Sequence, residues 1–275
     1  MQGKTMKKIA IFGTSGMLGH AAVGYFSQKG YTVTSFSRSD YDIAKDDPKK
    51  LFELTKGMDL VLNGAGVIKP RIAHMSIEDV MVVNSRFPRN LAKACDKNGA
   101  KLFHITTDCV YTGDKGAYNE DDLYDATDLY GLSKNGGDMS DCMVLRTSII
   151  GEEKDQARSL LEWAISQKGK QVNGFTNHQW NGVTTLCLVQ VVEDIMTKGL
   201  YKKGIFHIHS PKSVSKLELV EIISDVYELN LNVKSAEAAT FCDRTLSTKF
   251  ELSSEVCKKQ IQDQIVEMRA FFKGL

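Results

Sequence analysis

The sequence lacks the features that mark several classes of protein. Its 6 cysteines are scattered, with no CxxC pair and no His-rich ligand spacing, so we expect neither a bound metal nor a disulfide framework. No apolar run approaches the roughly 20 residues of a membrane span, and residues 1–8 contain no apolar signal region. Together these absences favour a protein of the reducing cytoplasm that has no membrane partner.

Neither sign of charge dominates the chain. The 35 Lys and Arg residues nearly balance the 34 Asp and Glu residues, which leaves a formal net charge of +1. No overall electrostatic footprint therefore points to a nucleic acid, and any anion that the protein binds must be held by a local site.

Proline is scarce as well. The chain has 4 prolines in 275 residues and contains no Pro-rich linker, repeat or low-complexity segment. We expect two regions packed as one body. We expect an NAD(P)-binding region at residues 6–150, starting at Met6. A mainly substrate-binding region is expected at residues 151–275, and it can contribute a strand or helix to the first region. No residue pattern decides between a monomer and a homodimer.

An alternation of strand and helix patterns fills the first half of the chain. Apolar runs typical of strands occur at residues 7–12, 31–36, 59–63, 101–106 and 142–147. Helical patterns separate them, including one long helix expected at 76–98. Because these strands are apolar on both faces, the pattern predicts an α/β, Rossmann-like doubly wound fold, with a parallel sheet covered by helices on both sides.

The alternation loosens after Gly151. Helices are expected at residues 157–168, 185–198 and 215–229, and a strand at 204–209. These elements predict a smaller C-terminal α/β region beside the larger sheet.

A glycine turn follows the first predicted strand. Gly13, Gly16 and Gly19 form the pattern GxxGxxG and lead into a predicted helix. Glycines at such a turn let the backbone approach a pyrophosphate, which then sits at the helix N-terminus. The turn predicts a dinucleotide site, against the alternative of a purely structural turn. Within it we also expect contacts to the cofactor from Ser15, Met17 and Leu18.

The end of the second predicted strand indicates which dinucleotide is bound. Ser37 and Arg38 stand where an NAD site usually has an acidic residue, and a guanidinium suits a 2′-phosphate. NADP(H) is therefore favoured, with NAD(H) as the alternative cofactor. The alternative for Arg38 itself is that it is a solvated surface residue without a role in binding. Asp42 and Ile43 are expected at the adenine. The small residues that would let the backbone approach the cofactor after the third strand are Gly64, Ala65 and Gly66.

Tyr130 and Lys134 form a YxxxK pair at the start of a predicted helix, where side chains four residues apart share one face. Three other pairs match the same pattern: Tyr25/Lys29, Tyr41/Lys45 and Tyr111/Lys115. Only Tyr130 heads a helix that follows the fourth strand. Thr107, which carries a hydroxyl group, stands at the C-terminal end of that strand. In such a group the tyrosine transfers a proton to a carbonyl oxygen, the threonine binds that oxygen and the lysine lowers the tyrosine pKa. A Tyr and Lys that merely cap a helix are the structural alternative.

Five segments, GTSGMLG, NGAG, VNSRFPRNLA, ITTDCVY and DLYGLSK, together resemble the extended short-chain dehydrogenase/reductase family. Their order most resembles the dTDP-4-dehydrorhamnose reductase group. The resemblance implies NADPH-dependent reduction of the 4-keto group of a nucleotide-diphospho-4-keto-6-deoxyhexose, in deoxysugar biosynthesis. It places Thr107, Tyr130 and Lys134 in the catalytic positions and Asn84 at the cofactor. The substrate-binding residues that we expect are Val67, Lys69, Asp108, Cys109, His178, Trp180 and Arg244.

The sequence departs from that group at three points. Thr184 and Thr245 stand where the group has proline, and Cys109 stands where it has tyrosine. The related GDP-fucose synthase group has a cysteine at the position of Cys109 and uses it with a histidine for epimerisation. Cys109 with His178 is thus a tentative second catalytic pair, against the alternative that Cys109 only packs.

Two further expectations follow from the resemblance. Some relatives, such as the beta subunit of methionine adenosyltransferase, keep the nucleotide but serve as non-catalytic regulatory subunits. The presence of Thr107, Tyr130 and Lys134 argues against that role here. His104, His207 and His209 are expected to be core or surface residues without a catalytic role.

Overall fold

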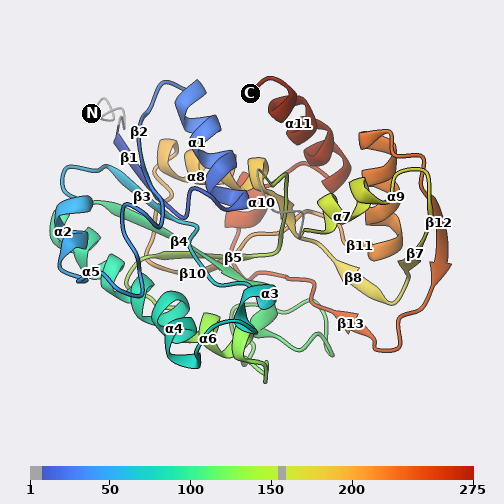
Figure 1. Ribbon diagram of the computed structural model, residues 1–275, viewed down its shortest axis with the longest axis horizontal. Helices are drawn as coiled ribbons and strands as arrows, with labels where there is room; N and C mark the ends of the chain where they lie inside the picture. The colour runs from blue at the N-terminus through green and yellow to red at the C-terminus, as the bar shows by residue number, and fades with distance from the viewer. Residues whose placement is uncertain (1–7, 154–158) are drawn as a thin grey trace.

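The computed structural model describes residues 8–153 and 159–275 (Figure 1). Its centre is a six-stranded parallel sheet with the strand order β10-β5-β4-β3-β1-β2. The direction of strand order reverses next to β1, and ligands of such sheets bind beyond the carboxyl ends of the strands at this reversal. The strands are β1 (Lys8–Phe12), β2 (Thr32–Phe36), β3 (Leu60–Asn63), β4 (Lys101–Thr107), β5 (Met143–Thr147) and β10 (Gly204–His207).

Helices cover both faces of this sheet, as predicted (Figure 1). Alternate residues of each strand point to opposite faces, so Ile9 and Ile11 belong to one apolar core and Ala10 and Phe12 to the other. The first core lies under α1 (Met17–Gln28) and α8 (Thr185–Thr197). The second lies under α2 (Lys50–Leu54) and α5 (Phe87–Asn98). Burial on both faces explains why these strands are apolar throughout.

The long helix predicted at residues 76–98 is wrong as a single regular helix. The structure has α4 (Ile77–Met81), a π-helical turn (Val82–Arg86) and then α5. Pro88, in the first turn of α5, has no N–H to offer the carbonyl of Asn84, so the regular hydrogen-bond pattern cannot continue there. The wider turn places Asn84 and Ser85 against α6 (Leu129–Gly137), whose Gly137 lies too close to the Asn84 carbonyl for any side chain.

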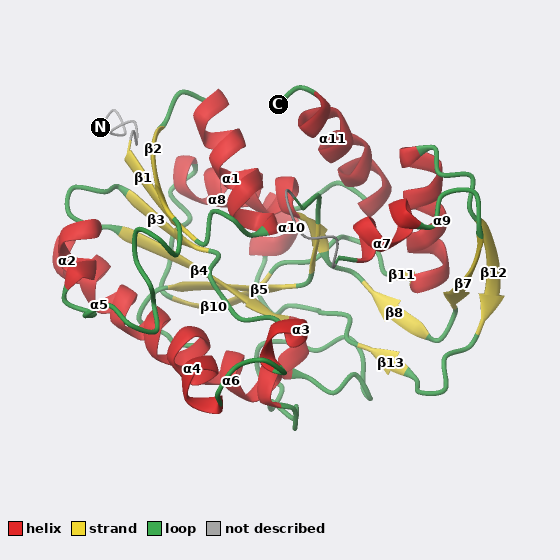
Figure 2. Cartoon of the chain, in the orientation of Figure 1, coloured by secondary structure: helices red, strands yellow, loops and turns green. Residues whose placement is uncertain are grey.

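Most of the remaining strands, with α7 and α9, form a smaller region beyond the carboxyl ends of β4 and β5 (Figure 2). Its strands pair as β12 with β7, as β11 and β13 on either side of β8, and as β6 with β9. Their bounds are β6 (Ile149–Ile150), β7 (Gln171–Phe175), β8 (His178–Trp180), β9 (Val183–Thr184), β11 (Val214–Ser215), β12 (Asn232–Ala236) and β13 (Cys242–Asp243). The helices not yet placed are α3 (Lys69–Ile72), α7 (Leu160–Ser166), α9 (Lys216–Tyr227), α10 (Leu252–Val256) and α11 (Ile261–Lys273).

The predicted elements of the second half are found with shifted ends. The strand predicted at 204–209 ends at His207, and the helix predicted at 215–229 is α9. Met6 and the start of the helix predicted at 157–168 lie outside the described residues. Within the described ranges we find no helix that combines the length and the apolar character needed to cross a membrane.

Candidate active site

The glycine turn between β1 and α1 is closely packed against the loop that follows β3. Gly13 has φ +84°, and a Cβ there would lie 2.7 Å from the amide nitrogen of Ala65. A Cβ on Gly19 would lie 2.2 Å from the carbonyl oxygen of Gly13. Gly16 precedes α1 and caps it without a side chain, which leaves the first N–H groups of the helix for another partner. The turn therefore fits a pyrophosphate at the N-terminus of α1.

The other residues of the turn surround this helix end. Leu18 is buried and its Cδ2 is 3.4 Å from the position of a Cβ on Gly64. Met17 lies against Gly151, and Ser15 is exposed. These contacts bring the turn, the loop after β3 and the start of the second region together.

The end of β2 lies beside the same turn, because the Gly13 N–H donates to the carbonyl of Phe36 at 3.2 Å. Ser37 bonds Asp40 through its N–H and its hydroxyl. The Arg38 side chain is 75% exposed and its Nε lies 3.2 Å from Asp42 Oδ2. An exposed guanidinium next to the dinucleotide turn has the charge and the fork of N–H groups that suit a phosphate. Ile43 packs at the edge of the core under α2.

Asn84 fastens the loop after β3 to α6. Its Oδ1 accepts from the Val67 N–H at 2.8 Å, and its Nδ2 donates to the Val67 carbonyl at 3.0 Å and to Ser133 Oγ at 2.9 Å. All three bonds are buried. Because both amide hydrogens have protein partners, the structure gives Asn84 a positioning role between Gly66–Val67 and α6, which the expectation of a cofactor contact did not anticipate.

Thr107, Tyr130 and Lys134 come together at the carboxyl end of β4. Asp128 caps α6 by accepting from the Gly131 N–H at 2.8 Å, and the helix carries Tyr130 and Lys134 toward the strand. Lys134 Nζ donates to the carbonyl of Ile105 at 3.2 Å. It also lies 3.5 Å from the position of a Cβ on Gly66, so glycine there leaves room for the ammonium.

Burial shapes the acid–base properties of this group. Desolvation raises the pKa of Tyr130 above its usual value, while the neighbouring Thr107 hydroxyl opposes that rise. Desolvation also lowers the pKa of Lys134. Tyr130 is therefore a neutral phenol at physiological pH, which is the form that can donate a proton.

The three other YxxxK pairs have structural surroundings. Tyr25 donates to Glu193 at 2.5 Å, Tyr41 is buried in the core under α2, and Tyr111 stacks on Tyr118 with ring centroids 4.2 Å apart. Tyr130 alone among the four lies beside Thr107, as the sequence argument required.

The hydrogen bonds of the described residues link neither Cys109 nor His178 to the other. The Cys109 pKa is raised to about 12, chiefly by burial and then by the neighbouring Asp108 carboxylate. His178 is on β8, and its Nε2 bonds the carbonyl of Thr240 at 2.8 Å. A buried thiol without an imidazole partner is suited to packing rather than to proton abstraction.

Three cations surround Asp108 and Cys109. Lys69 lies 5.8 Å from the centre of the Tyr130 ring and 2.7 Å from Asp128. Arg244 Nε donates to the carbonyl of Tyr111 at 2.8 Å, and its charge acts on Asp108 and Cys109. Lys216, which the sequence analysis missed, lies 5.1 Å from the centre of the Trp180 ring and interacts with Asp108. Such a cluster is suited to an anionic substrate.

One signal in the sequence could have revealed Lys216. Lys216 is the first residue of α9 and directly follows Ser215, which caps the helix together with Glu218 in a capping box. A cation at the first position of a helix opposes the helix dipole, so its presence there calls for another reason. Trp180, by contrast, is only 6% exposed and lies under Lys216, so it anchors the loop rather than presenting an open face.

Comparison with known proteins identifies the family. The profile of the RmlD substrate binding domain matches residues 6–271. The chain belongs to this family. It is similar to the dTDP-4-dehydrorhamnose reductase of Mycolicibacterium smegmatis, with 29% identity over 232 residues that cover 77% of this chain and 67% of the relative. The reductase of Aggregatibacter actinomycetemcomitans is 27% identical over 237 residues, which cover 80% of this chain and 79% of that protein.

The fold agrees with solved structures. The dTDP-4-dehydrorhamnose reductase of Bacillus anthracis, solved in complex with NADP, superposes with a TM-score of 0.81 at 20% identity and covers 98% of this chain and 100% of that chain. The predicted family resemblance and the predicted parallel α/β fold are thereby confirmed.

A buried polar network supports the end of α6 in this member of the RmlD family. Asp138 follows α6, and its Oδ2 is 2.5 Å from Arg146 on β5. Arg146 also donates to Tyr111 at 3.0 Å and to His207 Nε2 at 2.9 Å. His104 and His207 are buried, and His207 Nδ1 lies 2.8 Å from the Ser247 carbonyl. Within the described residues no group of three or more His, Cys, Asp or Glu side chains is arranged to hold a metal ion.

Proposed function

We propose that this protein is an NADPH-dependent reductase of the 4-keto group of a nucleotide-diphospho-4-keto-6-deoxyhexose and acts in deoxysugar biosynthesis, as its dTDP-4-dehydrorhamnose reductase relatives do. The observation that carries the proposal is the assembly of Thr107, Tyr130 and Lys134 at the carboxyl end of β4. The loop of Gly64, Ala65 and Gly66 connects this group to the dinucleotide turn.

The residues of the turn fit NADP(H). Gly13 and Gly19 allow backbone packing at the turn that a Cβ would prevent, the N-terminus of α1 would hold the pyrophosphate, and Arg38 would hold the 2′-phosphate. Bound NADPH supplies the hydride. The alternative NAD(H) would leave the Arg38 guanidinium without its phosphate.

Tyr130 delivers the proton in this mechanism. As the carbonyl carbon is reduced, its oxygen gains negative charge and takes the proton of the Tyr130 phenol. The Lys134 ammonium then stabilises the phenolate. Lowering a phenol pKa from its usual value of about 10 to about 7 requires roughly 4 kcal/mol of stabilisation. Because burial raises the Tyr130 pKa above that usual value, the demand on this charge is larger still. The Thr107 hydroxyl, now donating to Asp108 at 3.1 Å, turns to hold the substrate oxygen.

The cations Lys69, Lys216 and Arg244 would bind the diphosphate of the nucleotide sugar. Arg244 keeps its Nε on the Tyr111 carbonyl, so the rest of its guanidinium is oriented as a fork. Lys216 contributes a point charge above Trp180. Val67 and Asp108 would line the sugar between these cations and Tyr130.

A bifunctional 3,5-epimerase/4-reductase is less well supported. It would need a base at Cys109, whose pKa of about 12 leaves it as a thiol at neutral pH, and His178 is bonded elsewhere. A non-catalytic NADP-binding subunit would have no chemical need for the buried Lys134 ammonium beside Tyr130.

The deciding experiment follows NADPH absorbance with dTDP-, UDP- and GDP-linked 4-keto-6-deoxyhexoses in deuterated buffer. We expect turnover with one of them and no deuterium on the carbons next to the keto group. Deuterium at those carbons would instead support the bifunctional epimerase/reductase. Tight NADPH binding without turnover on any of the three would contradict the proposal and favour a binding role.

A further inference from the structure

Two cysteines from distant parts of the sequence meet inside the second region. Cys187 lies in the first turn of α8, and Cys257 directly follows α10. Their sulfur atoms are 3.8 Å apart, and the residues are 7% and 2% exposed. A disulfide needs the sulfurs at about 2.05 Å, so an approach of about 1.8 Å closes the bond. Adjustments of this size are within the reach of side-chain torsions.

The two thiols have different surroundings. Gln264 Nε2 points at Cys257 Sγ from 3.9 Å and also donates to Ser210 Oγ at 2.9 Å. Cys187 donates to Cys257, which lowers the pKa of Cys257 and raises that of Cys187. The two N–H groups of Gln264 Nε2 have closer partners in Ser210 Oγ, at 2.9 Å, and the Lys259 carbonyl, at 2.8 Å, so Cys187 is the main donor to Cys257. Cys257 is the thiol of the pair that ionises more readily.

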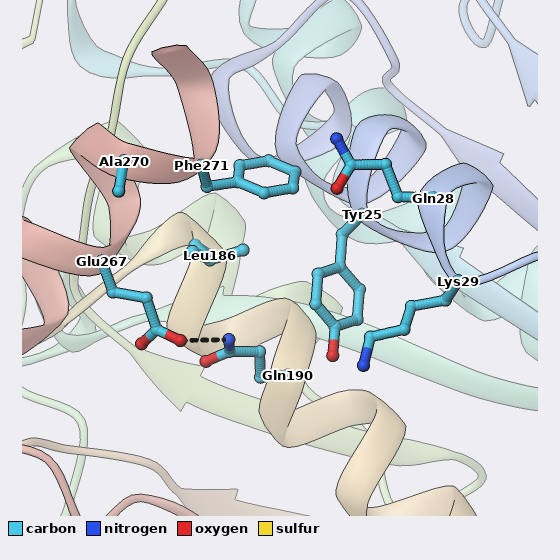
Figure 3. Close-up of a pocket in the computed structure, with 8 residues that line it drawn as sticks. All are labelled: Tyr25, Gln28, Lys29, Leu186, Gln190, Glu267, Ala270 and Phe271. Carbon is cyan, nitrogen blue, oxygen red and sulfur yellow. Dashed lines mark hydrogen bonds between the residues drawn. The ribbon is translucent and has the colours of Figure 1, made fainter. Parts of the chain in front are cut away.

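A pocket of about 350 Å³ lies between α1, α8 and α11 (Figure 3). Leu186, the neighbour of Cys187 in the chain, lines it together with Gln190 and Glu267. Figure 3 shows Gln190 bonded to Glu267, at 2.9 Å. The Glu267 charge also acts on Cys187. A small, uncharged oxidant would reach the dithiol from this side, where Leu186 lines the pocket and Cys187 follows it in the chain.

We propose that Cys187 and Cys257 are a redox-active dithiol that a hydroperoxide converts into a disulfide. The Cys257 thiolate attacks the peroxide oxygen and breaks the O–O bond, which gives a sulfenic acid and, with hydrogen peroxide, one water after protonation. The Cys187 sulfur attacks the sulfenic sulfur, and its proton leaves with the hydroxyl group as a second water. Two thiols lose two hydrogen atoms, and the peroxide is reduced to two waters.

The bond would join α8 to the segment that starts α11. α8 packs against α1 behind the dinucleotide turn, and α11 packs against α8 and α9. Gln264 on α11 already accepts from the Thr184 N–H at 3.0 Å, next to the start of α8. A covalent link at the same place would limit the unfolded chain and raise the melting temperature by several degrees, reversibly with dithiothreitol.

The test treats the full chain with hydrogen peroxide, unfolds it in an alkylating reagent and maps the peptides by mass spectrometry without reduction. We expect 4 of the 6 cysteines to be alkylated and a linked peptide pair that contains Cys187 and Cys257. Cys187→Ala and Cys257→Ala should abolish both the link and the rise in melting temperature, whereas Cys142→Ala should keep them.

Two results would overturn the proposal. Alkylation of all six cysteines after peroxide treatment would show that the pair does not close, and a link between other cysteines would assign the chemistry elsewhere. Because the peptides are mapped on the chain without substitutions, this result decides the proposal even if an alanine variant fails to fold.

Discussion

Arg146 and Asp138 form a buried ion pair, 2.5 Å apart, at the end of the helix that carries Tyr130 and Lys134. Neither side chain is more than 1% exposed. Removing one partner leaves an uncompensated charge in the core, which typically costs 3–5 kcal/mol. We therefore expect Asp138→Ala to lower the free energy of unfolding by about that amount, as measured in urea. The exposed pair Lys203–Asp96 is the control, where Asp96→Ala should cost less than about 1 kcal/mol.

Tyr130→Phe should lower kcat by a factor of about 10² to 10⁴, because the proton donor is lost while the ring and its packing remain. The dissociation constant for NADPH, measured by fluorescence titration, should stay within about twofold. Tyr25→Phe is the matched control, since it removes a hydroxyl that bonds Glu193 and should leave kcat unchanged. Equal losses in both variants would show that a general structural effect is being measured.

Arg38→Ala should weaken NADPH binding and leave NADH binding nearly unchanged. A charge-assisted hydrogen bond is worth about 1.5–3 kcal/mol, which corresponds to roughly a 10- to 150-fold higher dissociation constant. Calorimetric titration with both cofactors gives the comparison, and Lys29→Ala removes a cation near the other end of α1 as a control. An unchanged NADPH-to-NADH ratio would make Arg38 a surface residue only.

Lys216→Met should raise the KM for the nucleotide sugar about tenfold or more at little change in NADPH affinity. The ammonium above Trp180 is lost, whereas the aliphatic stem that covers the ring is kept. Lys212→Met, at an exposed lysine just before α9, is the control. If both variants raise the KM equally, the effect belongs to the general charge of this face.

The stability of the protein should fall in mildly acidic solution because of His207. Burial and the Arg146 charge lower the His207 pKa from 6.5 to about 4. The unfolded chain then binds a proton at higher pH than the native protein does. Stability from this group is complete above about pH 6.5 and is lost as the pH falls toward 4, by up to about 3 kcal/mol.

Urea unfolding at several pH values checks this, with His207→Gln expected to flatten the profile between pH 6.5 and 4. The Glu120 carboxylate accepts a hydrogen bond from the backbone N–H of His207 at 2.8 Å, and the pKa of Glu120 is lowered. Its contribution is lost only as the pH falls below about 4.5, so it does not explain a change that starts near pH 6. A profile unchanged by His207→Gln would contradict the assignment.

The sequence allowed the sheet and the proton-transfer group to be predicted because both depend on local patterns. The apolar strands alternate with helices, and Tyr130, Lys134 and Thr107 lie at fixed distances from strand and helix ends. The π-helical turn at Val82–Arg86 was not predicted, because it depends on the packing of Asn84 and Ser85 against α6. Helical periodicity over a window of residues does not detect one extra residue in a turn.

Contacts between distant segments were beyond the sequence patterns as well. Lys216 reaches Asp108 across more than a hundred residues of chain, and Cys187 meets Cys257 only after α8 and α10 have packed. No spacing rule links such positions. The place of His178 in the chain suggested a partner for Cys109, and in the structure its Nε2 bonds the Thr240 carbonyl on the segment that leads into β13, which pairs with β8.

The pairing of β10 with β5 affects how the chain folds during synthesis and how a truncated fragment behaves. β5 would be an open edge without β10, and its Met143, Val144 and Leu145 are completely buried in the finished fold. A fragment that ends at residue 150 would expose this strand along its full length and offer it to other chains. The sheet is completed only after residue 207 has been synthesised, so we expect the two regions to unfold together in one transition.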